Sequence, residues 1–329
     1  MCVSVRSVHR YSDRADACLF TGEPGDTRTM NEWQRTRKRG GWEHHGLLEW
    51  VEGDTTNLSV VFTWRLPDAY QKAVWYRTQG RKVRAGGPAV DLHPNYLADV
   101  ANCSGSYPAL RLHNPDACVT TVGCIRKCPF CAVPIIEGDF HELSNIQLRR
   151  IVCDNNFLAA SQRHFNFVVD GLKAFNDVDF NQGLDHRLLT KYHAERLAEL
   201  DLKCIRLAWD DTRYERGFMR AFNLLVDAGF PPSVVRAYVL IGWKDTPEDA
   251  LYRLETIRSL GAWPNPMRFQ PLDAMRKNEY VGKHWTDAEL KRYMRYWANL
   301  RYTSAIPFEE FAYRGQEPEQ IDGRQGRLM

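Results

Sequence analysis

Three cysteines lie close together in the stretch TTVGCIRKCPFCAVPIIEG, residues 120–138. Cys124, Cys128 and Cys131 have C-x3-C-x2-C spacing. Thiolates are good ligands for zinc and for iron–sulfur clusters. A structural zinc site normally takes four protein ligands, whereas three cysteines leave one corner of a four-iron cluster open to a small molecule. We therefore expect these three side chains to hold a [4Fe–4S] cluster, with structural zinc as the alternative.

The other cysteines fit a reducing compartment better than a disulfide framework. The chain has nine cysteines, an odd number, and its N-terminus carries charges where a signal peptide would have an apolar core. We therefore expect a cytoplasmic protein, in which structural disulfides are rare. Four further cysteines are expected to be small buried apolar side chains, namely Cys103, Cys118, Cys153 and Cys204.

Composition excludes several classes of protein. Of 329 residues, 44% are hydrophobic and 26% are charged, which is typical of a soluble globular protein and not of a disordered or fibrous one. No run approaches the ~18–20 apolar residues of a membrane helix, so we expect no membrane partner. The net charge of +3 does not by itself indicate a nucleic-acid-binding protein.

From Ala117 onward, strand-like and helix-like patterns alternate. Strands are expected at residues 117–122, 150–153, 178–182, 204–209, 234–242 and 266–270, helices between them, a polar helix near 141–149 and a last helix over 286–301. Six strand–helix units in roughly 180 residues are too few for an eight-stranded barrel. We therefore expect an α/β fold, a partial (βα)6 TIM-like barrel with an open side. Its ligands should lie at the carboxyl ends of the strands.

Two of these helices carry clear sequence signals. One helix after Ser161 has apolar residues at helical spacing, namely Phe165, Val168, Val169 and Leu172. Another has Thr246 as its N-cap and Pro247 at its first position.

The rest of the chain is expected to flank the barrel. A strand at 58–64, a helix at 67–79 and a second strand ending in Gly86-Gly87-Pro88 predict a small α/β unit. The predicted domains are a poorly ordered tail at 1–45, the α/β unit at 46–112, the barrel at 113–275 and a C-terminal helical cap at 276–329. Met30 is a candidate natural start within the tail.

The segment GCIRKCPFC and the run of six strands resemble the radical S-adenosylmethionine (radical SAM) superfamily over roughly residues 117–272. The resemblance implies that the three cysteines bind three irons of a [4Fe–4S] cluster. The fourth iron would chelate the amino and carboxylate groups of S-adenosyl-L-methionine. One-electron reduction, from an external reductant such as flavodoxin or ferredoxin, would cleave this cofactor to methionine and a 5′-deoxyadenosyl radical. That radical would take a hydrogen atom from a substrate that the sequence does not identify.

The resemblance and the strand-end rule together suggest the other cofactor contacts. The candidate residues are Phe130, Asp154, Asn155, Gln182, Arg187, Asp210, Ile241 and Gly242. Asp154 and Asn155 stand where many members have Gly-Gly-Glu, and they offer acceptor oxygens to the ammonium group or, alternatively, cap a turn. Gln182 is assigned to the ribose or the carboxylate, Arg187 to the carboxylate and Asp210 to the ribose hydroxyls. The segment Leu240-Ile241-Gly242 is assigned to the adenine.

Several alternatives remain open at this point. The 55–100 segment resembles part of a cobalamin-binding domain, but Asp91-Leu92-His93 lacks the expected glycine, so a cobalamin-dependent methylase is one alternative. A methylthiotransferase-like enzyme is another, although Cys2, Cys18 and Cys103 match a second cluster poorly. A non-catalytic zinc or electron-transfer protein is the third. Basic and aromatic residues in 284–312 suit RNA or a phosphorylated substrate, or simply an amphipathic helix with a solvated face.

Overall fold

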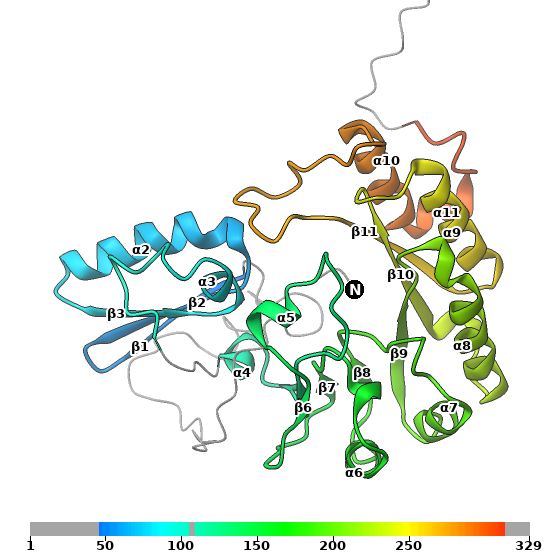
Figure 1. The fold of residues 1–329 in the computed structure, drawn as a ribbon, viewed down its shortest axis with the longest axis horizontal. Helices are drawn as coiled ribbons and strands as arrows, with labels where there is room; N and C mark the ends of the chain where they lie inside the picture. The colour runs from blue at the N-terminus through cyan, green and yellow to red at the C-terminus, as the bar shows by residue number, and fades with distance from the viewer. Residues whose placement is uncertain (1–45, 105–108, 313–329) are drawn as a thin grey trace, which may run out of the picture.

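The computed structural model describes residues 46–104 and 109–312 (Figure 1). The predicted N-terminal tail and its candidate start at Met30 lie outside the described residues. Within those residues, no helix combines the length and the apolar character needed to cross a membrane.

The N-terminal unit is a three-stranded sheet covered by helices. Strand β1 (Leu47–Glu52) pairs antiparallel with β2 (Thr55–Val60), which pairs parallel with β3 (Lys82–Gly86). Helix α2 (Leu66–Thr78) joins β2 to β3, and the short α3 (Pro88–Leu92) follows. The core of this unit is separate from that of the barrel and contains Leu58, Val60, Leu66, Ala69, Ala73, Val83 and Ala85. The strand–helix–strand order was predicted, whereas β1 was not.

The second unit is a six-stranded parallel sheet. Its strands are β4 (Ala117–Cys118), β7 (Ile151–Val152), β8 (Val178–Phe180), β9 (Leu202–Ala208), β10 (Val235–Ile241) and β11 (Trp263–Arg268). They lie in the order β11-β10-β9-β8-β7-β4, so each strand neighbours the next one along the chain. All five pairings are parallel. The strands follow one another in one direction, and the first and last strands, β4 and β11, do not pair. This arrangement is the predicted partial (βα)6 barrel.

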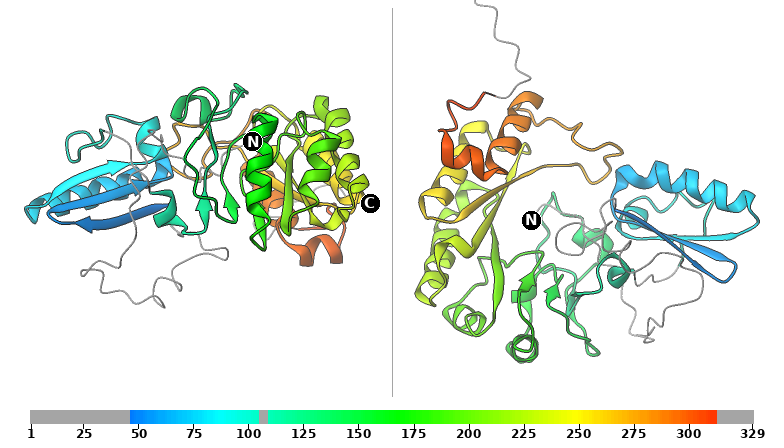
Figure 2. Two further views of the ribbon diagram at one scale, coloured as in Figure 1. Left: turned by 90° about the horizontal axis from the view of Figure 1, so that it is seen from below. Right: turned by 180° about the vertical axis from the view of Figure 1, so that it is seen from behind.

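Helices cover the outer, convex side of this sheet, while the cysteine loop lies on the inner, concave side (Figures 1 and 2). The covering helices are α6 (Gln162–Leu172), α7 (Lys191–Leu197), α8 (Glu215–Asp227) and α9 (Pro247–Ser259). The predicted helix starts are confirmed, since the Ser161 side chain accepts the His164 N–H and the Thr246 side chain accepts the Asp249 N–H, each at 3.2 Å.

Alternation along the strands gives the sheet two different faces. The convex face is apolar and packs on the helices through Ile205, Leu207, Trp209, Val235, Ala237, Val239 and Ile241. The concave face is mostly polar and carries Asp179, Arg206, Ala208, Arg236, Tyr238, Leu240, Asn265 and Met267. A polar concave face means that the inside of the partial barrel is not filled by a second apolar core.

The predicted C-terminal helix over 286–301 is two helices, α10 (Asp287–Trp297) and α11 (Leu300–Ala305). Thr286 and Glu289 form a capping box at the start of α10. Aromatic residues of α10 pack against the segment after α11. The ring centroids of Tyr293 and Phe308 are 4.6 Å apart.

The segment between β4 and β7 differs from the prediction. The expected strand over 117–122 is divided into β4 and β5 (Thr121–Val122), and β5 pairs antiparallel with β6 (His141–Glu142). The predicted helix near 141–149 was wrong, because its first residues form β6 and no helix follows before residue 150. The antiparallel pairing of β5 and β6 brings together the two ends of the cysteine loop, which contains the short helix α5 (Val133–Ile136). Long-range pairing therefore overrides the local polar pattern.

The chain's division into units at residues 112 and 275 stays a prediction. The segment after β11 reaches back to the N-terminal unit, where Met275 packs against the core and the Thr63 hydroxyl donates to the Ala274 carbonyl.

Candidate functional site

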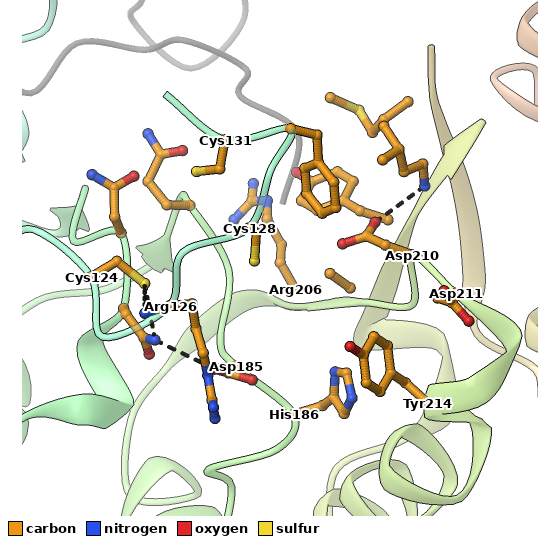
Figure 3. A pocket seen from close by; sticks show the side chains of 18 of the residues that line it. Cys124, Arg126, Cys128, Cys131, Asp185, His186, Arg206, Asp210, Asp211 and Tyr214 are labelled. Carbon is orange, nitrogen blue, oxygen red and sulfur yellow. Dashed lines mark hydrogen bonds and ion pairs between the residues drawn. The ribbon is translucent and has the colours of Figure 1, made fainter. Parts of the chain in front are cut away.

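A large cavity lies between the cysteine loop and the concave face of the sheet (Figure 3). Its volume is about 1290 Å³, which exceeds the ~300–1,000 Å³ typical of a pocket for one small ligand. The cavity is lined by all three clustered cysteines and by side chains of β7 to β11. Figure 3 shows the cysteines on one side, with Asp210, Asp211 and Tyr214 opposite them.

The cysteine loop carries three free thiols, each partly exposed. The Cys131 N–H donates to the Cys128 carbonyl at 3.0 Å, which makes a tight turn between these two residues. The Cys124 sulfur accepts two hydrogen bonds, from the Arg126 N–H and from the Asn156 amide, both at 3.3 Å. Hydrogen bonds of this kind stabilise a sulfur that carries negative charge, as a metal-bound thiolate does.

The donor set fits an iron–sulfur cluster in its chemistry. Burial raises the pKa of the Cys131 thiol to about 11, so metal coordination would be needed to keep this group as a thiolate near neutral pH. Among the described residues, no three His, Cys, Asp or Glu side chains are already gathered closely enough to hold a single metal ion. The three thiols thus share one cavity, and they would have to turn toward a common centre to bind a cluster.

Glu137 anchors the start of the cysteine loop, a role that the sequence did not reveal. Gly123 has a left-handed φ of 80° and its N–H donates to Glu137 Oε2 at 2.7 Å. The Asn155 amide donates to Glu137 Oε1 at 2.6 Å. Burial raises the pKa of Glu137 to about 7. The only signal in the sequence was a carboxylate within the otherwise apolar run VPIIEG.

The two residues after Cys153 have different positions. Asp154 is buried, accepts the Thr120 N–H at 2.6 Å and also binds the Thr120 hydroxyl. It does not line the cavity, so the structure gives it the turn-holding role that was the alternative to cofactor binding. Asn155 does line the cavity. The next residue, Asn156, was not predicted, yet it contacts the Cys124 sulfur directly.

Asp185 organises the polar side chains beside the loop. It is 3% exposed and accepts hydrogen bonds from Arg126 Nε at 3.0 Å and Arg187 Nε at 2.6 Å. Burial acts in the opposite direction, but the hydrogen bonds of the two guanidinium groups hold the pKa of Asp185 below its usual range. Arg187 lines the cavity as predicted, although its charge is already paired, and Gln182 lies there too.

The carboxyl ends of β9 and β10 are held together by Arg253, which is fully buried. Its Nη1 donates to the carbonyls of Trp209 and Leu240, at 3.0 and 3.1 Å. Its Nη2 pairs with Asp245 Oδ2 at 2.7 Å. The predicted residue Asp210 lines the cavity next to this junction and accepts the Leu240 N–H at 3.2 Å.

Of the segment Leu240-Ile241-Gly242, which was predicted to contact adenine, one residue lines the cavity. Leu240 lines the cavity, whereas Ile241 points to the convex core, as strand alternation requires. Gly242 does not line the cavity either. Its φ is 81°, and a Cβ there would lie 2.7 Å from Leu290 Cδ2. Ile241 and Gly242 are therefore corrected to packing positions.

An aromatic wall closes the cavity near the cysteines. Phe130, predicted as a site residue, packs edge-on against Trp243 with ring centroids 4.9 Å apart. Leu240 and Phe269 complete this apolar group, against which Cys128 and Cys131 pack. The wall shields one side of the cysteine loop from water.

No protein-family model and no curated protein matches the sequence. Two solved structures are similar to parts of the chain. The first is a radical S-adenosylmethionine methyltransferase, TsrM from Kitasatospora setae, with cobalamin and a [4Fe–4S] cluster bound. It is 11% identical, with a TM-score of 0.47, and the match covers 66% of this chain and 65% of that one.

The second is methylornithine synthase, PylB, which is 13% identical with a TM-score of 0.37. That match covers 54% of this chain and 62% of the other. The chain thus spans less than two thirds of the length of either structure, and neither likeness is close enough to transfer a substrate or a ligand.

Proposed function

We propose that this chain is a radical SAM enzyme. The observation that carries the proposal is that Cys124, Cys128 and Cys131 lie on a loop at the carboxyl ends of a parallel partial barrel and line one large cavity. Three thiols at the strand ends suit a cluster that has one iron without a protein ligand. The wide polar cavity beside them has space for a second cofactor.

In this proposal, the three cysteines hold a [4Fe–4S] cluster and S-adenosyl-L-methionine binds beside it. When bound, the pair supplies reductive cleavage of the cofactor to methionine and a 5′-deoxyadenosyl radical, which takes a hydrogen atom from the substrate. The residues of the chain position these groups. Asn156 and the Arg126 N–H donate to the Cys124 sulfur, and Glu137 fixes the start of the loop.

Other residues are proposed to bind S-adenosyl-L-methionine and to exclude water. Asn155, Gln182 and Asp210 offer polar groups at three different strand ends, all within the cavity. Leu240, Phe130 and Trp243 offer an apolar surface to the adenine on the same side. Excluding water matters because a reactive radical must meet only its substrate.

The reductant and the compartment are also proposals. Lys127, next to Cys128, and Lys244, above the Trp243 ring at 4.6 Å, are exposed beside the cavity. This basic rim suits an acidic electron-transfer protein such as a flavodoxin or ferredoxin. A reducing cytoplasm would keep the thiols available for the cluster.

The test is an anaerobic assay of the reconstituted chain with dithionite and S-adenosyl-L-methionine, in which 5′-deoxyadenosine and bound iron are quantified. The parent should hold about four irons and form 5′-deoxyadenosine. The triple variant Cys124→Ala/Cys128→Ala/Cys131→Ala should lose both. Cys103→Ala is the matched control, because Cys103 is a partly exposed free thiol outside the cavity. A parent that holds its iron but never forms 5′-deoxyadenosine, with or without candidate substrates, would count against the proposal. A colourless protein that contains zinc would indicate a structural metal site instead.

A further inference from the structure

The concave face of the sheet carries positive charge that the cysteine loop does not use. We call the group formed by Lys203 and Arg206 on β9 and Arg236 on β10 the basic floor. All three residues line the cavity. Arg206 and Arg236 do so from the concave face, whereas Lys203 lies at the amino-terminal end of β9, at a position that alternates with Arg206. Arg206 and Arg236 are direct partners in the β9–β10 pairing, so two guanidinium groups stand side by side on the same face. Like charges in that arrangement repel and favour a bound anion between or beside them.

Among residues 46–104 and 109–312, one carboxylate forms an ion pair with the basic floor. Asp179 on β8 accepts a hydrogen bond from Arg206 Nη2 at 3.0 Å, and both residues are buried. Within the described residues, neither Lys203 nor Arg236 makes an ion pair, and both are exposed. In the described part of the chain, the three basic groups of the floor therefore outnumber the one carboxylate that pairs with them. A concave wall of one sign concentrates anions from solution.

Neutral polar groups complete the surface. Tyr238 follows Arg236 on the same face of β10, and Asn265 on β11 is its register partner. On the other side, the partner of Tyr238 is Ala208, whose small side chain leaves space beside the ring. A forked guanidinium flanked by hydroxyl and amide donors is well suited to a carboxylate or phosphate group.

Arg236 lies closer to the amino-terminal end of β10 than Leu240, the residue of that strand against which the cysteine loop packs. Leu240 is four residues after Arg236 on β10, which is about 13 Å along the strand at ~3.3 Å per residue. A molecule held by its anionic end at the basic floor would extend along the sheet toward the loop. The large volume leaves space for that molecule in addition to a cofactor beside the loop.

We propose that the basic floor binds the anionic group of the substrate, a carboxylate or a phosphate, and so directs the rest of the molecule toward the cysteine loop. The description of this anion as part of a substrate rests on the proposed function. The anion site itself can be tested without turnover.

The test is isothermal titration of the full, cluster-reconstituted chain with citrate and, separately, with inorganic pyrophosphate, at constant ionic strength. These two probes distinguish a carboxylate site from a phosphate site. The variant Lys203→Gln/Arg236→Gln removes the two charges that lack a carboxylate. The control Arg163→Gln/Lys283→Gln also removes two exposed positive charges, from positions outside the cavity.

The parent is expected to bind at least one probe with a millimolar or lower Kd. The Lys203→Gln/Arg236→Gln variant should bind it at least about tenfold more weakly, and the control should stay within about twofold of the parent. Absence of binding by the parent, or equal affinity in both double variants, overturns the inference.

If the double variant does not fold, two single variants replace it. Arg236→Lys keeps the charge and should stay within about fivefold of the parent, whereas Arg236→Glu should lose at least about tenfold. Equal affinities of these two variants overturn the inference. The 5′-deoxyadenosine assay of the parent reports on the proposed function separately, so failure of one can be told from failure of the other.

Discussion

At the residue scale, the hydrogen bond from Asn156 to the Cys124 sulfur gives the first prediction. Asn156→Ala removes one donor to this sulfur. Hydrogen bonds to cluster ligands stabilise the reduced, more negative state. If the bond differs by ~1 kcal/mol between the two oxidation states, the potential should fall by roughly 40 mV. A redox titration followed by electron paramagnetic resonance measures this shift.

The control for this prediction is Asn145→Ala, an exposed amide outside the cavity, which should leave the potential unchanged. Asn156 also donates to Asp185 Oδ2 at 3.4 Å, so iron content must be measured in parallel. Full iron content with an unshifted potential would show that this hydrogen bond does not act on the cluster.

Glu137 gives a pH-dependent prediction at the same scale. Burial raises its pKa from 4.5 to about 7, so the folded chain binds this proton more tightly than the unfolded chain does. Its contribution to stability is therefore complete below pH ~4.5 and is lost as the pH rises through ~7. The loss amounts to roughly 3 kcal/mol at most. Glu137→Gln cannot ionise, and its amide oxygen can still accept the Gly123 N–H if the Asn155 amide turns over.

Melting temperatures of the metal-free parent and of Glu137→Gln, measured from pH 5 to pH 8, test this. Other buried carboxyls, such as Asp154, are common to both proteins and cancel in the difference. The Tm of the variant minus the Tm of the parent should increase as the pH rises. A difference that stays constant over this range would contradict the shifted pKa.

At the scale of elements, the return from β5 to β6 determines the shape of the cysteine loop. Gly123 and Gly138 both have left-handed φ, at 80° and 76°. A Cβ at Gly123 would overlap the backbone oxygen of Asp139, whereas a Cβ at Gly138 would meet nothing within 4 Å. Gly123→Ala should therefore lower the free energy of unfolding by more than the ~1–2 kcal/mol of left-handed strain alone and reduce iron incorporation.

Gly138→Ala is the matched control, because it shares the backbone strain but not the overlap. We expect it to keep its iron and to cost about 1 kcal/mol. Thermal unfolding and iron analysis of the two variants measure the difference. Equal effects of the two substitutions would mean that strain, and not the close approach to Asp139, governs the loop.

The elements also show what the sequence could predict. The cysteine spacing and the alternation of strands and helices are local patterns, and they led to the loop and to the parallel sheet. The helix expected near 141–149 failed because β6 forms by pairing with β5, some twenty residues earlier. Ile241 was included among the site residues because the two faces of a buried apolar strand cannot be told apart from the local sequence. Glu137 and Asn156 were missed because their partners become neighbours only in the fold.

At the scale of the whole molecule, a buried hydrogen bond connects the N-terminal unit to the barrel. Ser59 on β2 and His113 at the end of α4 (Leu110–His113) are both buried, with Oγ and Nε2 2.8 Å apart. Leu110 of the same helix packs with Ala117 on the edge strand β4 and with Ile151 on the neighbouring strand β7. The contact therefore links β2 to the edge of the sheet that precedes the cysteine loop.

Ser59→Ala should lower the free energy of unfolding by about 1–3 kcal/mol, because it removes a buried hydrogen bond of the His113 ring. The effect should appear as faster hydrogen–deuterium exchange in both β2 and α4, since the bond joins these two elements. Ser233→Ala, at an exposed serine, is the control and should change neither. Faster exchange in β2 alone would mean that the two units are held together by other contacts, such as the packing of Met275 against the N-terminal core.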